Sequence, residues 1–347
     1  MSNNKDQKIR LAITHGDLNG VGYEVILKTF ADQRMFDFCI PVLYGSSKVA
    51  SYHKKLLTSV QQEFQFNTIR DAADALPGRY NIINLTQDEI KIDLGKSTEI
   101  AGALSRESLG RVCADLKDGK VDVLVTAPIN KRNIQAPDFD FPGHTEYLSH
   151  QFGSSSLMLM VCDRIRIGIV TNHLALKDVP AALTHDLLTE KLTLLNQSLK
   201  QDFGITTPKI AVLALDPHAG DNGVIGDFDQ RVIRPVIDEA QARGILAYGP
   251  FPSDGFFGSS EFNKFDGVLA LYHDQGLIPF KLMSFTEGVN YTAGLPYVRT
   301  SPAHGTGYDI AGHDCASEQS FRSAVYLACN ILRKRREYAE LTADPLK

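Results

Sequence analysis

Short apolar runs alternate with longer amphipathic segments along most of this 347-residue chain. Runs dense in Val, Ile and Leu are typical of strands covered on both faces. Their alternation with segments of helical period predicts an α/β fold with a mainly parallel sheet. The predicted strands are 8–14, 38–45, 80–85, 121–128, 156–162, 165–172, 209–215, 246–251 and 265–272. The predicted helices are 21–33, 46–59, 100–118, 144–151, 185–201, 227–242 and 317–338.

One pair of neighbouring runs is connected differently from the others. Only Asp163 and Arg164 separate the runs 156–162 and 165–172. A two-residue connection is too short for a parallel crossover, so it favours an antiparallel hairpin and hence a mixed sheet. The length of the chain indicates two domains, or one large α/β unit with insertions.

Composition and charge exclude several kinds of partner. The hydrophobic content of 43%, the charged content of 22% and the net charge of −5 are those of an ordinary globular protein without a basic excess. We therefore expect no nucleic-acid partner. The five cysteines form no CxxC pair, which favours reduced thiols, and no apolar run approaches the length of a membrane span or a secretory signal. A cytoplasmic protein without a membrane partner is expected.

Three histidines follow predicted strands in the same way. His173, His218 and His273 lie 45 and 55 residues apart, so they form no local metal motif. In open α/β sheets, ligands bind outside the carboxyl ends of the strands, where three imidazoles can hold one divalent ion with a fourth position open. The alternative at each position is a loop histidine bonded to the backbone. Gly276 is predicted to turn the chain after the last strand. Three nearby acids could orient the rings or only form turns: Asp216, Asp221 and Asp274.

Further polar side chains fall at the ends of predicted elements. The strand 121–128 runs into Asn130 and Lys131. His144 and Thr145 begin a predicted helix, where unpaired N–H groups favour an anion, although Thr145 could instead be the N-cap. Four more residues lie in segments with little helical period: Lys281, Asn290, Arg299 and His304. Cations in such loops suit a phosphate or carboxylate substrate, and a solvated lysine is the alternative.

A glycine-rich stretch, GDLNGVG at 16–22, follows the first predicted strand. Its pattern is GxxxGxG, so its glycines are not placed as in the GxGxxG dinucleotide fingerprint. Alone, it is a weak candidate for a phosphate loop.

Together, these motifs resemble one family. ITHGDLNGVGYE, TAPINK, FPGHTEYL, TNHLALKDV, DPHAGDNGVIG, YHDQGLIPFK and HGTGYDIAG occur in the order found in the 4-hydroxythreonine-4-phosphate dehydrogenases of pyridoxal phosphate biosynthesis. The family is similar in fold to the isocitrate and isopropylmalate dehydrogenases, which bind NAD without GxGxxG. The resemblance implies two α/β/α domains with mixed sheets and an active site in the interdomain cleft. The first domain would be 1–127 plus 301–347, and the second, 128–300, would carry the metal ligands and a dimer interface.

The resemblance also implies roles for individual residues. The metal ligands would be His173, His218 and His273, and these with Lys281 form the implied catalytic set. The substrate contacts would be His144, Thr145, Lys281, Asn290 and Arg299. The cofactor-facing residues would be His304, Gly305, Thr306 and Asp309. The general base is left open between Lys281, an aspartate near the metal and water. Leu18 and Tyr23 stand where the family usually has proline.

The implied reaction is the NAD-dependent oxidation of 4-phosphohydroxy-L-threonine to 2-amino-3-oxo-4-phosphooxybutanoate, which decarboxylates to 3-amino-2-oxopropyl phosphate. The implied cofactors are NAD or NADP and one divalent metal per subunit, zinc first, with cobalt or magnesium as alternatives. The implied assembly is a homodimer with the metal site at its interface. Three other functions stay open: a dehydrogenase of a four-carbon sugar-acid 4-phosphate such as threonate or erythronate 4-phosphate, a phosphate-handling acyltransferase, and a non-catalytic sensor.

Overall fold

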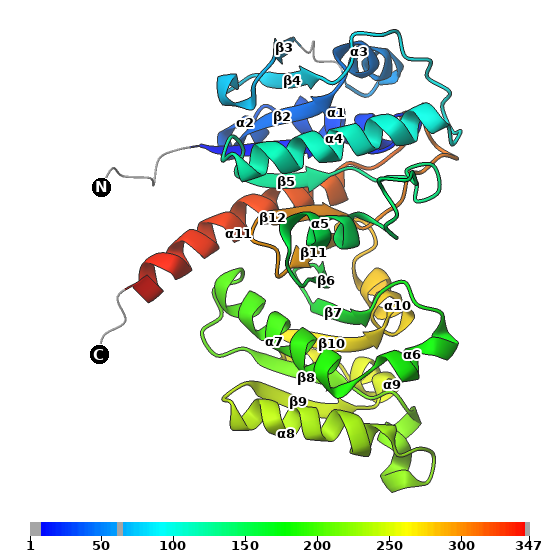
Figure 1. Ribbon diagram of the computed structural model, residues 1–347, viewed down its shortest axis with the longest axis vertical. Coiled ribbons are helices and arrows are strands. Elements are labelled where there is room, and N and C mark those ends of the chain that lie inside the picture. The colour runs from blue at the N-terminus through cyan, green and yellow to red at the C-terminus, as the bar shows by residue number, and fades with distance from the viewer. Residues whose placement is uncertain (1–7, 61–64, 344–347) are drawn as a thin grey trace. The chain divides into compact units, whose positions relative to one another are not determined.

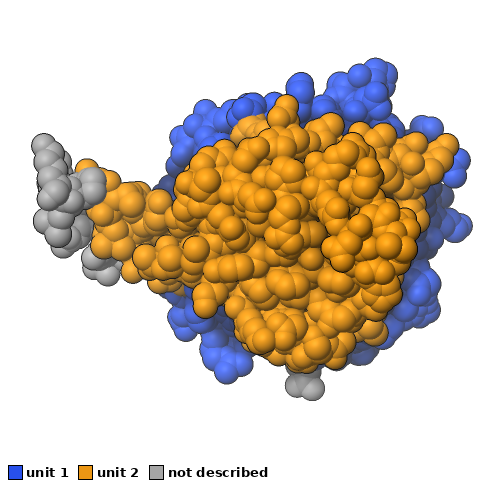
Figure 2. All heavy atoms as spheres, turned by 90° about the horizontal axis from the view of Figure 1, so that it is seen from below, with its two compact units in different colours: residues 1–153, 296–332 blue, residues 154–295, 333–347 orange. Residues whose placement is uncertain are grey.

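The computed structural model describes residues 8–60 and 65–343. The chain divides into two compact α/β units, shown in blue and orange in Figure 2. Unit 1 comprises Met1–Gly153 and Pro296–Leu332, and unit 2 comprises Ser154–Leu295 and Arg333–Lys347. No helix in the described part of the chain has the length and apolar character needed to cross a membrane.

Unit 1 is built on a parallel sheet (Figure 1). Its strands lie in the order β3 (Phe66–Ile69), β4 (Tyr80–Asn84), β2 (Cys39–Gly45), β1 (Ile9–Thr14), β5 (Val123–Thr126) and β12 (Val298–Pro302). Its helices are α1 (Gly22–Ala31), α2 (Met35–Phe38), α3 (Ser47–Leu56), α4 (Glu99–Lys117), α5 (His144–Phe152) and the first part of α11 (Gln319–Ala343). The central strands β1, β2 and β5 are almost completely buried, as their Val- and Leu-rich sequences require.

Unit 2 contains a mixed sheet. Its strands lie in the order β11 (Val289–Ala293), β6 (Leu157–Val161), β7 (Arg166–Thr171), β10 (Gly267–Tyr272), β8 (Lys209–Leu213) and β9 (Leu246–Phe251). β11, β6 and β7 pair antiparallel, and β7, β10, β8 and β9 pair parallel. Its helices are α6 (Val179–Ala182), α7 (His185–Gln201), α8 (Arg234–Ala242), α9 (Ser253–Gly258) and α10 (His273–Met283).

The predicted elements agree with these bounds to within a few residues, and the mixed α/β fold and the β6–β7 hairpin are confirmed. Three short strands were not predicted: β3, β11 and β12. The predicted turn at Gly276 is wrong, because Gly276 lies within α10. A Cβ at Gly276 would lie 2.3 Å from Ile169 Cδ1 and 3.1 Å from Ala270 Cβ. This glycine therefore allows α10 to pack closely against β7 and β10.

The limits of unit 1 differ from the domain limits expected from the sequence, because the unit continues to Gly153. Several hydrogen bonds hold the segment 128–153 to the rest of unit 1. Asn133 Nδ2 donates to Asp17 Oδ2 at 2.7 Å, and Arg106 Nη1 donates to the Ile134 carbonyl at 2.9 Å. The end of the chain belongs to unit 2, where Arg335 Nε donates to the buried carboxylate of Asp202 at 2.6 Å.

Candidate functional site

The three predicted metal ligands follow adjacent parallel strands of unit 2. β10 pairs with β7 on one side and with β8 on the other, so the carboxyl ends of all three lie at the same edge of the sheet. His273 begins α10 directly after β10, and His173 follows β7. Their ring centroids are 6.2 Å apart. His218 follows β8 within the helical turns of η3 (Pro217–Gly223).

The structure brings two of the three imidazoles side by side and does not close the triad. Within residues 8–60 and 65–343, no three His, Cys, Asp or Glu side chains are placed so that they could hold a metal ion together. The donor chemistry nevertheless fits one. Asp274 Oδ1 lies 2.7 Å from His273 Nδ1, an arrangement that orients an imidazole and leaves Nε2 available to a metal.

The backbone around His218 has an unusual conformation. Five successive residues, 218–222, have φ between 44° and 76°. The left-handed region costs an L-residue about 1–2 kcal/mol, so neighbouring contacts must stabilise this loop. Asp229, in the π-helical segment η4 (Asp229–Ile233), accepts hydrogen bonds from the N–H groups of Leu215 at 2.8 Å and Asp216 at 2.9 Å. Burial raises the pKa of Asp229, and these two donors oppose that shift.

Two of the predicted substrate contacts lie near each other in unit 1, in a buried cluster whose positive charge comes from Arg299. Arg299 lies on β12 and is 3% exposed, and its Nε and Nη2 donate to Thr126 Oγ1 at 3.2 and 2.6 Å. Burial lowers the pKa of Arg299 to about 9, opposed by the charge of Glu146. His144 Nε2 is buried and has no hydrogen-bond partner among the described residues. Burial, and then the charges of Arg299 and Lys131, hold the pKa of His144 well below its usual value. A neutral imidazole beside a buried guanidinium can bind an anion.

The start of α5 supports the same chemistry. The helix begins at His144, and its N-cap is Gly143, which offers no side-chain cap. The alternative that Thr145 is the N-cap is therefore wrong. The first N–H groups of a helix have no partner within it and attract anions. They lie on the residues that carry the His144 and Thr145 side chains, so backbone and side chains could bind the same anion.

The other predicted substrate contacts belong to unit 2. Lys281 lies in the last turn of α10, so the expectation that its segment lacks helical period is wrong. Its side chain is exposed. Asn290 lies on β11, and its Oδ1 is buried without a hydrogen-bond partner in the described part of the chain. An amide oxygen in this state is available to a ligand that donates a hydrogen bond.

The predicted cofactor-facing residues 304–309 pack against the glycine-rich stretch 16–22. The Val21 N–H donates to the Thr306 carbonyl at 2.9 Å, and a Cβ at Gly20 would lie only 2.5 Å from that oxygen. A Cβ at Gly16 would lie 2.3 Å from the Pro128 carbonyl oxygen. The glycines of this stretch are thus explained by close approaches between backbone segments, without a phosphate.

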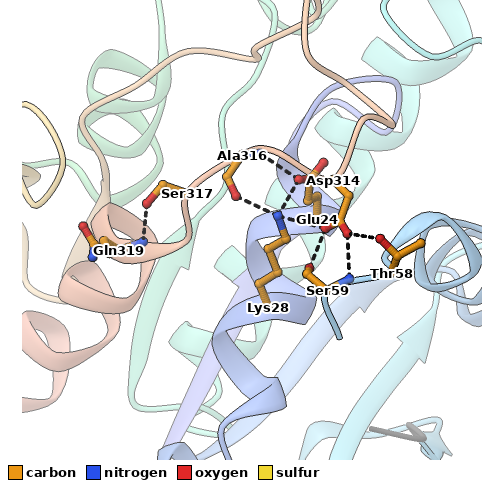
Figure 3. A network of polar contacts seen from close by, with 8 residues as sticks. All are labelled: Glu24, Lys28, Thr58, Ser59, Asp314, Ala316, Ser317 and Gln319. Atoms are coloured by element: carbon orange, nitrogen blue, oxygen red, sulfur yellow. Dashed lines mark hydrogen bonds and ion pairs between the residues drawn. The ribbon is translucent and has the colours of Figure 1, made fainter. Parts of the chain in front are cut away.

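The segment that follows, 312–318, is held by charges (Figure 3). Lys28 Nζ on α1 lies 2.8 Å from Glu24 Oε1 and 3.0 Å from Asp314 Oδ1. Asp314 also accepts hydrogen bonds from Thr58 and Ser59, and Glu24 accepts one from the Ala316 N–H. These side chains come from distant parts of the sequence and fix the chain directly after the predicted cofactor-facing residues.

Several residues that shape these loops were not among the predicted site residues. Asp229 and Gln275 hold strand ends in unit 2, and Asp17 and Tyr308 meet in unit 1. The available signal was a polar side chain beside an apolar run or within a motif such as YHDQG. That signal does not identify a partner distant in the sequence.

Fold and site together define a two-unit α/β protein with imidazoles at one sheet edge and a buried cationic cluster that suits an anionic ligand. Residues 37–328 match the family described as pyridoxal phosphate biosynthetic protein PdxA. The 4-hydroxythreonine-4-phosphate dehydrogenase of Bacteroides thetaiotaomicron is 48% identical over 345 residues, 99% of this chain and 94% of that protein. The protein of the same name from Sulfurihydrogenibium sp. is 38% identical over 331 residues, 94% of this chain and all of that protein.

A solved structure agrees with these sequence relationships. The crystal structure of 4-hydroxythreonine-4-phosphate dehydrogenase from Klebsiella pneumoniae matches with a TM-score of 0.82 at 31% identity, over 95% of this chain and 99% of that chain. This chain therefore belongs to the PdxA family, and the resemblance inferred from its motifs is confirmed. The names of these relatives identify the family as one of dehydrogenases.

Proposed function

We propose that this chain catalyses the NAD-dependent oxidation of 4-phosphohydroxy-L-threonine to 2-amino-3-oxo-4-phosphooxybutanoate, whose decarboxylation gives 3-amino-2-oxopropyl phosphate. The observation that carries the proposal is 48% identity over 99% of the chain to a relative named for this substrate. Histidines at the carboxyl ends of three adjacent strands and a buried cationic cluster support it, because the reaction needs an activated hydroxyl and bound anions.

One divalent ion would be held by His173, His218 and His273. Zinc is the first choice for this ion, and cobalt or magnesium are the alternatives. When bound, such an ion acts as a Lewis acid that lowers the pKa of a substrate hydroxyl. Asp274 would keep the imidazole of His273 in the orientation that presents Nε2. The rings of His273 and His173 already lie with their centroids 6.2 Å apart, which supports a role for both in one site.

His144, Thr145 and Arg299 would bind one anionic group of the substrate. The guanidinium is held in place by Thr126, and its burial excludes the water that would otherwise screen its charge. Lys281 and Asn290 would supply a cation and an amide from unit 2. Lys281, an aspartate near the metal and water remain the candidates for the general base.

Residues His304, Gly305, Thr306 and Asp309 would face NAD, with NADP as the alternative. The nicotinamide supplies the hydride acceptor, and the protein supplies position and charge. Two hydrogen bonds hold this segment against the glycine-rich stretch, one from Val21 to Thr306 and one from Tyr308 to Asp17. These contacts support a preformed loop, which reduces the entropy lost when a cofactor is ordered.

A homodimer formed through unit 2 is part of the proposal. Ile278 and Leu282 share one face of α10 and are 59% and 84% exposed, and Phe285 just beyond the helix is 80% exposed. Exposed apolar side chains gathered in this way are typical of surfaces that bind another protein. Because α10 also begins with His273, a partner bound here would lie close to the proposed metal ligands. A cytoplasmic location is also part of the proposal, since the five cysteines, free in this structure, would stay reduced there.

The test is an assay of NADH formation from 4-phosphohydroxy-L-threonine, run with and without a chelator. Threonate 4-phosphate and erythronate 4-phosphate serve as parallel substrates. We expect turnover of the amino acid substrate, loss of turnover with the chelator and recovery on adding zinc or cobalt. Faster turnover of a sugar-acid phosphate would assign the chain to that substrate. An absence of NADH or NADPH with every substrate would reject a dehydrogenase.

A further inference from the structure

One buried amide in unit 2 connects the ends of two strands that precede predicted metal ligands. Gln275 lies in the first turn of α10 and is 8% exposed. Its Oε1 accepts a hydrogen bond from the Leu271 N–H of β10 at 2.7 Å. Its Nε2 donates to the Ala214 carbonyl at 2.7 Å and to Ser253 Oγ of α9 at 2.9 Å. The amide thus uses its acceptor and its donors on β10, on the residue that follows β8 and on α9.

The two backbone groups that Gln275 binds lie just before the proposed ligands in the sequence. Leu271 is two residues before His273, and Ala214 is four residues before His218. Beyond Ala214, the N–H groups of Leu215 and Asp216 are held by the Asp229 carboxylate. Two buried side chains therefore fix three successive backbone residues before the left-handed loop of His218.

We propose that Gln275 is a positioning residue of the metal site, which sets the spacing between the His273 and His218 loops. This inference rests on the proposed function, because it takes these histidines as ligands. A metal tolerates ligand distances that vary by only about 0.2 Å, so the strand ends that carry the ligands must keep a defined separation. Residues that orient ligands without touching the metal typically change metal affinity about 10–100-fold.

The chemistry of the amide explains why glutamine suits this position. The Leu271 N–H and the Ala214 carbonyl are buried groups of opposite kind, and an amide satisfies both. In Gln275→Met the volume is similar, but both backbone groups lose their partner. The strand ends then need water or a shift to satisfy these groups, and either changes the relation between the two loops.

The test measures binding of Zn²⁺ and Co²⁺ to the metal-free full-length protein by competition with a coloured chelator, together with the visible spectrum of bound Co²⁺. Gln275→Met should weaken binding roughly 10–100-fold and alter the Co²⁺ spectrum. Gln241→Met is the matched control, because Gln241 Nε2 of α8 also donates to a backbone carbonyl, that of Ala247, at 2.7 Å. It should keep the wild-type affinity and spectrum. Gln275→Leu is the second variant if Gln275→Met does not fold.

The possible results distinguish the positioning role of Gln275 from the existence of the metal site. A folded Gln275→Met protein with wild-type affinity and spectrum would overturn the positioning role, even if its stability were reduced. Equal weakening by Gln241→Met would also overturn it, because any lost glutamine bond would then have the same effect. A wild-type protein that binds neither ion would reject the metal site itself, and Gln275 with it.

Discussion

The phenol of Tyr308 donates a 2.7 Å hydrogen bond to the fully buried carboxylate of Asp17, 291 residues earlier in the chain. Asn133 Nδ2 and the Asn19 N–H also donate to that carboxylate, and Asn130 Nδ2 donates to the Tyr308 hydroxyl. Burial, and then Asp17, raise the pKa of Tyr308, so the phenol keeps its proton and remains a donor. One carboxylate thereby joins the glycine-rich stretch, the loop after β5 and the predicted cofactor-facing segment.

Tyr308→Phe removes one donor from this buried carboxylate. We expect a loss of about 1–3 kcal/mol in stability and a KM for NAD that rises several-fold more than the KM for the phosphorylated substrate. The check is steady-state kinetics with each substrate varied in turn. Tyr44→Phe is the control, because Tyr44 donates to the buried Asp115 at 2.8 Å in the same unit. It should lose stability with both KM values unchanged. The same kinetic change in both variants would argue against a specific role for Tyr308.

His218→Ala should abolish turnover and leave the fold intact. The side chain is exposed, so its removal costs little packing, but the proposed metal site would lose one of three ligands. Activity with added zinc and far-UV circular dichroism check both parts of this expectation. Near-normal activity of the metal-stripped variant would refute the assignment of His218 as a ligand.

Lys28→Met should destabilise unit 1. Lys28 is the cation between Glu24, which is 1% exposed, and Asp314. Its removal leaves a buried carboxylate without its charge partner, a loss of roughly 3 kcal/mol measured by urea unfolding. The control is Arg34→Met. Arg34 pairs with Asp32 at 2.6 Å on the surface, where solvent screens the charges, so little stability should be lost. Equal losses of stability in Lys28→Met and Arg34→Met would show that burial of the ion pair does not determine the effect.

Acid should weaken the fold through two buried histidines. His15 and His53 stack on Tyr23, and burial lowers the pKa of each to about 4. Because the folded pKa lies below that of the unfolded chain, the unfolded state binds more protons between pH 6.5 and 4. Stability is therefore present above pH 6.5 and is lost as the pH falls toward 4, by up to about 3 kcal/mol per histidine.

The variant His53→Gln isolates this effect. The glutamine amide can still donate to the Leu18 carbonyl, which lies 2.9 Å from His53 Nε2, but it does not titrate. Its unfolding free energy should fall less steeply between pH 6.5 and 4 than that of the wild type. His150→Gln, at an exposed position of α5, should keep the wild-type slope. Identical slopes for His53→Gln and wild type would show that His53 does not couple folding to protonation.

The local pattern of the chain determined its elements and its class. Strands such as β10 and helices such as α7 need only their own apolar period, and the two-residue connection alone determines the β6–β7 hairpin. β3, β11 and β12 have only four or five residues, and their pairing depends on partners distant in sequence. The histidine motifs marked the ends of three strands. The sequence could place these ends together because the carboxyl ends of adjacent parallel strands share one edge of a sheet.

Only the tertiary structure decided how these parts meet. It turned the segment after His273 into a helix, because Gly276 lets α10 pack on β7. It placed His144 beside Arg299 in a buried cluster, joined Tyr308 to Asp17, and put the amide of Gln275 between two strand ends. Each of these relationships joins residues that are separated in sequence and acts through burial, and a local pattern of residues carries no information about which distant groups will share a buried site.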